Sequence, residues 1–396
     1  MRIVHFDQMF HPEFGDQINV LPKLQVELGH EVYIVTGKSN IPHPRFLNFA
    51  DNTNMSLKDK IYEEETGVKI IRIDVLRFIS GRAIYKRGYK KLVDGLNPDI
   101  LFCHFNDTIV GMHYTIISNK LKYPVIFDSH MLDLASKNKL KSVFRSFYRK
   151  VITPIIKRNK LIIIRTQDDD YVNKELGVPG KLTPFISFGS DTTIFKPDKN
   201  VRETFRKQNN IKAEDFVVLF TGQLNKDKGI NLLAEAFNLN FSSEKNIVLV
   251  VVGNVSKEYE SELNLLFNES KNKIIRFGTQ KYVDLAKFYQ MADLSVFPKQ
   301  CSLSFYDAQA CGLPVVAEKN NINIDRLAHN NGELYIENSV KDLKSKIELF
   351  ANLSKEDYEK YTKNAQNYVE ENYDYKDITL QYEEIIQSEY KRFNKK

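Results

Sequence analysis

The stretch VFPKQCSLSFYDAQACGLPVV, residues 296–316, decides the fold of this chain. An apolar strand pattern is followed by a polar loop, a small-residue helix with one acid, a Gly-Leu-Pro break and a second apolar run. This order places a helix N-terminus beside the end of a parallel strand, where backbone N–H groups and the helix dipole favour a phosphate. Asp307, about one turn into the helix, could reach a ligand hydroxyl. An ordinary βαβ turn with a solvated acid fits this stretch equally well.

Length and composition indicate a globular protein with two domains. The chain has 396 residues, of which 42% are hydrophobic, and one core rarely grows to that size. The first residues, MRIVHF, read as a strand, so we expect no signal peptide. No apolar run approaches the ~18 residues of a spanning helix. Three cysteines without metal-ligand spacing, Cys103, Cys301 and Cys311, indicate a reducing compartment, and we expect a cytoplasmic protein.

Strand-like and helix-like segments alternate in both halves of the chain, which predicts doubly wound parallel sheets. Between the halves, residues 189–200 are rich in Gly, Ser, Asp and Pro and read as a linker. We therefore expect two Rossmann-like domains, residues 1–190 and 191–375, whose strand ends face a common cleft, and a helix over 376–396 that packs back on the first domain. The expected strands are 1–6, 31–36, 69–74, 99–105, 124–129, 161–166, 183–188, 216–222, 246–253, 273–279, 294–299, 313–318 and 332–337.

The loop TGQLNKDKG, residues 221–229, opens the second half and could hold a phosphate. Gly222 ends a buried strand, Gly229 directly precedes a helical pattern, and the loop carries Lys226 and Lys228. A strand, a loop with lysines and a helix start together make a phosphate site. A solvated loop whose lysines bind nothing remains the alternative.

The first half offers a glycine and two histidines at the expected carboxyl edge of its sheet. Gly15 precedes a helical pattern and permits close approach of a ligand or a backbone. His104 and His130 each follow a predicted strand and could bind phosphate or act as a base, although a histidine in this place is often structural. A GxGxxG fingerprint is missing after the first strand, which argues against a dinucleotide enzyme.

An acidic run, Asp168–Asp170, is the one candidate for a magnesium site. Acids in the first turn of a following helix explain it better, because the helix dipole favours them there. No Cys/His cluster suggests zinc. The sequence therefore predicts no metal and no cofactor.

A basic segment covers residues 137–160, with nine Lys or Arg residues and no acid. Apolar residues interleave these at helical spacing, which predicts an amphipathic basic helix broken at Pro154. Such a helix could dock on an anionic membrane surface. A helix that covers a sheet and has a solvated basic face is the favoured alternative. Nucleic-acid binding is not expected, because no stacking aromatics or groove-reading motif accompany the charges.

Taken together, these segments resemble the retaining glycosyltransferases of family 4, which have the GT-B fold. The likeness covers nearly the whole chain and follows its order. It is carried by HPEFGDQINVLPKLQVELGHEVYIVTG (11–37), SFGSDTTIFKP (187–197), TGQLNKDKGINLLAEAF (221–237), FGTQ (277–280) and YDAQACGLPVV (306–316).

The resemblance implies a donor site and a catalytic His130 that binds the sugar or the phosphate. The implied catalytic residues are His130, Lys228 and Asp307. The implied donor-binding residues are Gly15, Gly222, Gln223, Lys228, Gly278, Thr279, Lys299, Ser302, Leu303, Ser304 and Asp307.

Three residues depart from the family's pattern. Gln223 replaces an arginine, Asp307 replaces the second of two glutamates, and Lys299 stands where the first glutamate should fall. The contacts to the transferred sugar are therefore in doubt.

The implied activity is transfer of a sugar, with retention, from a nucleotide sugar such as a UDP-sugar to a glycan or lipid-linked acceptor. Surface polysaccharide or glycolipid synthesis is the implied setting, in the cytoplasm or at the inner membrane face. A catalytically weak or inactive GT-B scaffold, or a sugar-nucleotide epimerase, is the alternative. Neither the sugar, the base, the acceptor nor the oligomeric state can be read from the sequence.

Overall fold

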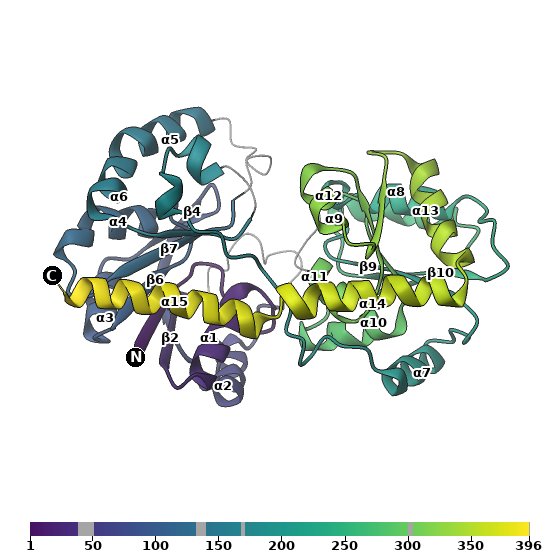
Figure 1. Cartoon of the computed structure of the whole chain (residues 1–396), viewed down its shortest axis with the longest axis horizontal. Coiled ribbons are helices and arrows are strands. Elements are labelled where there is room, and N and C mark those ends of the chain that lie inside the picture. Colours follow the sequence, from purple (N-terminus) through teal and green to yellow (C-terminus); the bar gives the residue numbers. More distant parts are fainter. Residues whose placement is uncertain (39–50, 132–139, 168–170, 300–303, 396) are drawn as a thin grey trace. The chain divides into compact units, whose positions relative to one another are not determined.

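The computed structural model describes residues 1–38, 51–131, 140–167, 171–299 and 304–395. They form two compact units. The first lies within Met1–Leu47 and Asp51–Phe188 and also contains Lys376–Lys396, and the second is Gly189–Tyr375. Each is built on a six-stranded parallel sheet flanked by helices (Figure 1). The prediction of two α/β Rossmann-like domains is confirmed.

The first sheet has the strand order β3-β2-β1-β6-β7-β8. Its strands are β1 (Arg2–Phe6), β2 (Glu31–Gly37), β3 (Lys69–Ile73), β6 (Ile100–Cys103), β7 (Val125–Ser129) and β8 (Ile163–Arg165). The helices of this unit are α1 (Gln17–Glu27), α2 (Met55–Thr66), α3 (Tyr89–Gly95), α4 (Ile109–Ile117), α5 (Lys141–Phe147), the π-helical turn η4 (Tyr148–Ile152), α6 (Thr153–Asn159) and α15 (Tyr375–Asn394). Short helical turns are η2 (Ser118–Lys120), η5 (Tyr171–Glu175) and η6 (Gly180–Leu182).

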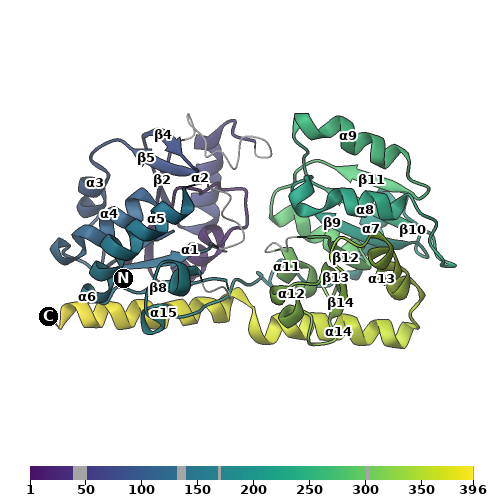
Figure 2. The same ribbon diagram turned by 90° about the horizontal axis from the view of Figure 1, so that it is seen from above.

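The second sheet repeats this order as β11-β10-β9-β12-β13-β14. Its strands are β9 (Phe216–Thr221), β10 (Ile247–Val252), β11 (Ile274–Phe277), β12 (Leu294–Phe297), β13 (Val315–Glu318) and β14 (Gly332–Tyr335). Its helices are α7 (Lys199–Gln208), η7 (Lys226–Lys228), α8 (Ile230–Phe237), α9 (Lys257–Asn268), η8 (Val283–Leu285), α10 (Ala286–Met291), α11 (Ser304–Ala310), α12 (Asn321–Arg326), α13 (Val340–Asn352) and α14 (Lys355–Asn372). Helices α7 and α10 pack together. So do α8 with α13 and α11 with α14 (Figure 2).

The apolar runs of the sequence form buried strands in both sheets. Strands β9 and β10 are buried at every position, as expected for parallel strands covered on both faces. In the first unit, alternate residues of β1 separate two layers. Val4 and Phe6 face the large apolar cluster, whereas the neighbouring His5 is one of several buried polar side chains on the other face.

Two predictions about local structure need correction. Residues 183–188 form no strand, and Phe185 makes only an isolated bridge to Arg165; Pro184 has no N–H to donate to a ladder. A hairpin of β4 (Val75–Ile79) and β5 (Arg82–Tyr85) was not predicted.

The basic segment is helical through Pro154, which lies in the first turn of α6, where a missing N–H costs little. The predicted break at this residue is therefore wrong. A π-helical turn, η4, precedes α6 instead.

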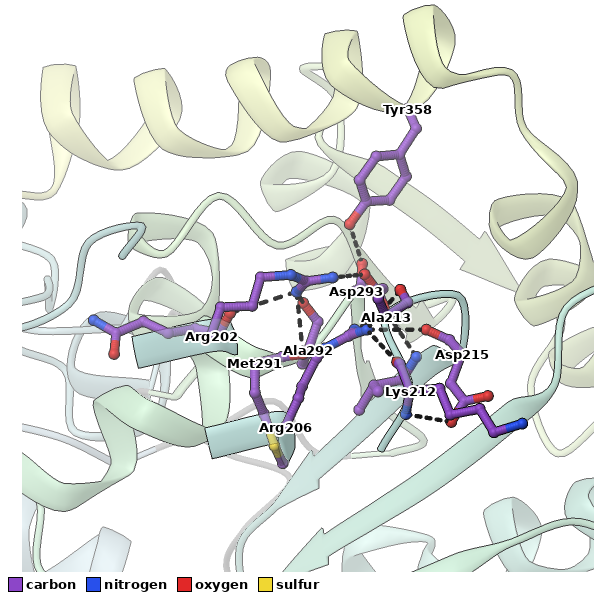
Figure 3. Close-up of polar contacts among 11 residues, drawn as sticks. Arg202, Arg206, Lys212, Ala213, Asp215, Met291, Ala292, Asp293 and Tyr358 are labelled. Atoms are coloured by element: carbon purple, nitrogen blue, oxygen red, sulfur yellow. Dashed lines mark hydrogen bonds and ion pairs between the residues drawn. The ribbon is translucent and has the colours of Figure 1, made fainter. Parts of the chain in front are cut away.

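A buried ion-pair cluster joins five elements at the amino edge of the second sheet (Figure 3). Asp293, directly before β12, accepts hydrogen bonds from Arg206 and Arg202 of α7 and from the backbone N–H of Val217 on β9. Arg206 Nε also donates to the carbonyl of Met291, which ends α10, at 2.8 Å. Tyr358 of α14 donates to the Asp293 carbonyl at 2.7 Å. The cluster fixes α7, α10 and α14 against the sheet.

Candidate functional site

In the second unit, the strand order reverses direction between β9 and β12, which are hydrogen-bonded neighbours. Ligands of doubly wound sheets bind outside the carboxyl ends of the strands at such a switch point. The loop after β9, residues 222–229, and the segment after β12, which begins at Pro298, both start there. The structure thus places the two predicted phosphate segments side by side.

Glycines let these loops approach one another closely. Gly222 has φ 140°, and a Cβ on Gly253 would lie 1.9 Å from the Gly222 carbonyl oxygen, so only glycine fits beside it. Gly229 has φ 73°, and a Cβ there would lie 2.9 Å from side-chain atoms of Pro298 and Lys299. The loop after β9 therefore lies directly against the end of β12.

The loop itself has a defined shape. Asn225 caps the turn η7, accepting from the backbone N–H of Lys228 at 2.9 Å. Lys226 points away to an exposed ion pair with Glu262, while Lys228 is partly buried next to Gly229. Lys228 is therefore the lysine that the loop holds in place at the switch point.

The predicted donor-binding residues Gly278 and Thr279 directly follow β11. Thr279 N–H donates to the side-chain oxygen of Asn254, which follows β10, at 3.1 Å. That oxygen would also be 3.2 Å from a Cβ on Gly278. Gly278 and Thr279 thus join the same carboxyl edge as Gly222 and Gln223.

Near β12, the structure describes Lys299 and Ser304 but not the residues between them. Lys299 is partly buried beside Gly229, and Ser304 begins α11. The predicted residues Ser302 and Leu303 lie outside the described residues, as do Cys301 and the acidic run Asp168–Asp170.

Asp307 is buried inside the second unit. Its Oδ1 accepts from Ser190 Oγ at 2.7 Å and from Tyr282 OH at 3.2 Å. Burial raises the pKa of Asp307 to about 7, although these two hydrogen bonds act in the opposite direction. The solvated aspartate of the plain βαβ-turn alternative is therefore wrong. At neutral pH this carboxyl group lies near its point of half-protonation.

In the first unit, His130 directly follows β7 and is in contact with Asp128 of that strand. His130 Nε2 lies 3.1 Å from Asp128 Oδ2 but outside hydrogen-bonding geometry, and no other described residue partners this nitrogen. Phe105 and Phe188 pack against the His130 ring, whose side chain is 21% exposed. Phe105 has φ 63°, a strained conformation for a residue with a side chain. The His130 ring is thus held by two phenylalanine rings and the Asp128 carboxylate.

The second predicted histidine, His104, is deeply buried. Its Nδ1 lies 2.6 Å from Asp128 Oδ2. Burial opposes the charged form of His104, but the adjacent Asp128 carboxylate outweighs this and raises the pKa of His104. Burial likewise opposes the charge on Asp128, yet the two histidines keep its pKa below the usual value. A charged pair is the stable form.

Gly15 lies in the turn between β1 and α1, one residue before the α1 N-cap Asp16. It therefore belongs to the carboxyl edge of the first sheet, as His104 and His130 do. The donor-binding residues of the second half and these three residues occur in separate units.

One group of side chains has the composition of a metal site. Single ligand atoms of His104, Asp128 and His130 lie within 4.8 Å of one another. Ligand atoms around zinc stand about 2.9 Å or more apart, given bond lengths of about 2.0–2.2 Å. The 2.6 Å contact between His104 and Asp128 is a hydrogen-bond distance instead. The prediction that no metal is needed stays a prediction.

Sequence reasoning missed Asp128 and His5, which contact His104, and Gln25 and Glu383, which are connected to it through His5. His5 Nδ1 lies 3.0 Å from His104 Nε2. Asp128 carried a signal, because a charged residue inside the apolar run PVIFDS needs a partner. Glu383 carried none, since its partner Gln25 is 358 positions away.

Residues 201–368 match the family model of the glycosyl transferases group 1. A probable sucrose-phosphate synthase from Thermosipho melanesiensis is 23% identical over 96% of this chain and 92% of its own length. The lipopolysaccharide 1,2-N-acetylglucosaminetransferase of Salmonella typhimurium is 33% identical over 31% of this chain and 35% of its own.

Among solved structures, Anabaena Alr3699/HepE in complex with UDP and glucose superimposes with a TM-score of 0.73. Its identity is 19%, and the match covers 98% of this chain and 100% of that chain. The chain thus has the GT-B fold, and residues 201–368, within its second unit, match the group 1 glycosyl transferases.

Proposed function

We propose that this chain is a retaining glycosyltransferase that moves a sugar from a nucleotide sugar, a UDP-sugar in our assignment, to a glycan or lipid-linked acceptor. The observation that carries the proposal is the meeting of two loops at the switch point of the second sheet. Gly229 packs against Pro298 and Lys299 there, with Lys228 beside it, within the residues that match the family model. The relatives from Salmonella and Anabaena, named for an N-acetylglucosamine transfer and a UDP complex, are consistent with this donor.

In this proposal, charge builds up on the β-phosphate as the nucleoside diphosphate leaves the anomeric carbon. Lys228 and backbone N–H groups near Ser304 stabilise that charge, which is the main way a preorganised site lowers such a barrier. The acceptor hydroxyl attacks from the face that the diphosphate leaves, and the leaving phosphate takes the proton. We assign no metal to this step.

Donor recognition follows from the same edge of the sheet. We assign the nucleobase to backbone groups of Gly278 and Thr279, and the ribose hydroxyls to Asp307 Oδ2, because both described hydrogen bonds of this carboxyl go to Oδ1. The place of His130, directly after β7 at the carboxyl edge of the first sheet, supports its assignment to the sugar or the phosphate. Lys299 would face the diphosphate or an acidic sugar.

A scaffold without turnover is the second candidate, and two residues favour it. Gln223 removes a charge from the diphosphate site, and Lys299 replaces a carboxylate. The test is a panel of UDP-, GDP- and CMP-sugars, with donor hydrolysis and thermal shift measured on the full chain. We expect a thermal shift and slow hydrolysis with one UDP-sugar. Binding without hydrolysis or transfer would favour the scaffold.

We further propose that α5 and η4 dock the protein on an anionic membrane surface in surface polysaccharide or glycolipid synthesis. Among the described residues, no helix has the length and hydropathy of a transmembrane span. An apolar stripe is exposed, however, at spacings of three and four residues: Leu140 (66% exposed), Val143 (67%), Phe147 (45%) and Val151 (43%). Exposed basic residues flank the stripe: Lys141, Arg149, Lys150, Lys157 and Arg158. Apolar contact and charge would act together there.

The docking test is sedimentation with phosphatidylglycerol vesicles, with phosphatidylcholine vesicles for comparison. Arg145 is a poor site for mutation because it pairs with Glu175 at 2.7 Å and holds the fold. We expect Lys141→Glu combined with Lys150→Glu to lose sedimentation, and salt to weaken it in the wild type. Lys91→Glu combined with Lys207→Glu, also exposed, is the charge-matched control. Equal sedimentation of both double variants would refute docking through this stripe.

A further inference from the structure

A chain of hydrogen bonds crosses the interior of the first unit, from α15 to the end of β7. Gln25 Nε2 donates to Glu383 Oε1 at 3.0 Å, and Gln25 Oε1 faces His5 Nε2 at 2.7 Å. His5 Nδ1 lies 3.0 Å from His104 Nε2, and His104 Nδ1 lies 2.6 Å from Asp128 Oδ2. All five side chains are buried. The C-terminal helix is thus connected to the residue beside His130.

At the α15 end of this hydrogen-bond chain, Glu383 is an acceptor. As an ionised carboxylate, Glu383 has only acceptor atoms. His30 Nε2 then carries the proton and donates to Glu383 Oε2 at 2.9 Å. Glu383 therefore accepts at both oxygens, from His30 and from Gln25.

The hydrogen-bond chain ends in an acceptor on both sides, Glu383 and Asp128. One side chain between them must therefore donate to both of its neighbours. The Gln25 amide cannot be that member, because its oxygen faces His5 once its nitrogen faces Glu383. His5 must therefore donate from Nε2. Either His5 or His104 then has protons on both ring nitrogens.

Geometry places the second proton on His104. The titratable groups near it are His5 of β1, Asp7 directly after β1, Asp128 of β7 and His130 directly after β7. Glu383 is connected to His104 only through Gln25 and His5. Asp128 is in direct contact, whereas His5 reaches a carboxylate only through Gln25. Burial and the neighbouring His104 charge lower the pKa of His5 to about 3.

We propose that His104 is a buried imidazolium selected by Glu383 of the C-terminal helix, and that it holds Asp128 as the carboxylate that positions His130. Asp128 also accepts the backbone N–H of Phe105 at 2.8 Å, and Phe105 packs on the His130 ring. Asp128 and His104 are positioning residues in this account. Their effect on turnover rests on the proposed function, but the protonation state of His104 does not.

The proposal predicts the result of one substitution at a distance. In Glu383→Gln, the new side-chain oxygen still accepts from His30, so its amide nitrogen faces Gln25. Gln25 then turns over and donates to His5 Nε2. His5 must move its proton to Nδ1 and donate to His104, which becomes neutral. At each of these hydrogen bonds the donor and the acceptor change places. The hydrogen-bond chain as a whole then carries one proton fewer.

The experiment is ring-nitrogen NMR of the full chain labelled with ¹⁵N-histidine at about pH 8, well above the ordinary pKa of histidine. Single variants of His5 and His104 assign the signals. In the wild type, we expect both His104 nitrogens protonated and His5 protonated only at Nε2. Glu383→Gln should give a neutral His104 and a proton on His5 Nδ1. Glu384→Gln, the same change at the exposed neighbouring residue, should match the wild type.

Several results would overturn the proposal. A singly protonated His104 in the wild type refutes the imidazolium even if the variant does not fold. Unchanged histidine signals in a folded Glu383→Gln refute selection by the helix. Loss of the His104 Nδ1 proton on adding stoichiometric Zn²⁺ would identify a metal site instead.

Turnover tests the positioning role separately. We expect Glu383→Gln to lower kcat by about tenfold, as removal of orienting partners commonly does, with the donor KM unchanged. Glu384→Gln should leave both constants unchanged. If Glu383→Gln shifts the proton but leaves kcat unchanged, the proposed positioning of His130 by Asp128 is wrong. If the wild type turns over no donor, the proposed function fails while the NMR result still decides the protonation of His104.

Discussion

Two buried ion pairs lie at opposite edges of two similar sheets. Arg206 and Asp293 meet at the amino edge of the second sheet, and His104 and Asp128 meet at the carboxyl edge of the first. Arginine keeps its charge at any physiological pH, and Arg206 donates to several backbone carbonyls besides Asp293. Histidine holds a proton that its neighbours can move. The Arg206–Asp293 pair, called here the permanent pair, occurs where helices must be fixed. The His104–Asp128 pair, whose proton its neighbours can move, occurs where strand ends can meet a ligand.

The largest expected effect comes from breaking the permanent pair. Arg206→Met keeps most of the side-chain volume but leaves the buried Asp293 carboxylate with fewer partners. We expect the unfolding free energy of the second unit to fall by about 3–5 kcal/mol, because a buried charge loses its counter-ion. Urea unfolding followed by circular dichroism measures this change. Arg202→Met removes a more exposed partner of the same carboxylate and should cost only about 1 kcal/mol. Equal losses in both variants would contradict the central role of Arg206.

A second change concerns the buried acid at the carboxyl edge of the second unit. Asp307 has a pKa of about 7 when folded, against an ordinary value of about 4. Between these pH values the unfolded chain has lost the proton and the folded chain keeps it, so wild-type stability falls as pH rises. Asp307→Asn has no proton to lose. Its stability advantage should be absent below about pH 4 and grow to on the order of 4 kcal/mol above pH 7. An advantage that does not change with pH, in urea unfolding from pH 4 to 8, would refute this assignment.

A third change separates activity from stability. We expect Lys228→Ala to raise the barrier of the transfer step by about 2–4 kcal/mol, through loss of charge on the leaving diphosphate. Its unfolding free energy should stay within about 0.5 kcal/mol of the wild type, because the side chain is not part of the core. Lys226→Ala is the matched control, since this lysine pairs with Glu262 at the surface. The same loss of kcat/KM in both variants would contradict the site.

Comparison of the two units also shows how much of the structure could be predicted from the sequence. Parallel strands buried on both faces read as apolar runs, so β9 and β10 were predictable. The half-exposed hairpin of β4 and β5 lacks such a run, and its turn at Ser80 and Gly81 was the only signal. The loop with Gly222 and Lys228 was predictable because its pattern is local.

The ion pairs were less accessible to sequence reasoning. Arg206 and Asp293 are 87 positions apart, and Gln25 and Glu383 are 358 apart. No local pattern connects such residues, because the pairing arises only when the sheet and its helices pack. A charged residue inside an apolar run, such as Asp128, shows that a partner exists but not which residue it is.

The smallest effect sharpens the description of the permanent pair. Tyr358→Phe removes one hydroxyl that donates to the Asp293 carbonyl from α14 and leaves the ion pair intact. We expect a loss of about 1 kcal/mol, the usual net contribution of one hydrogen bond. In the double variant with Arg206→Met the two losses should not add, because both residues act on Asp293. The coupling energy from urea unfolding of the four proteins is the measurement. Strict additivity would mean that α14 is anchored independently of the Arg206–Asp293 pair.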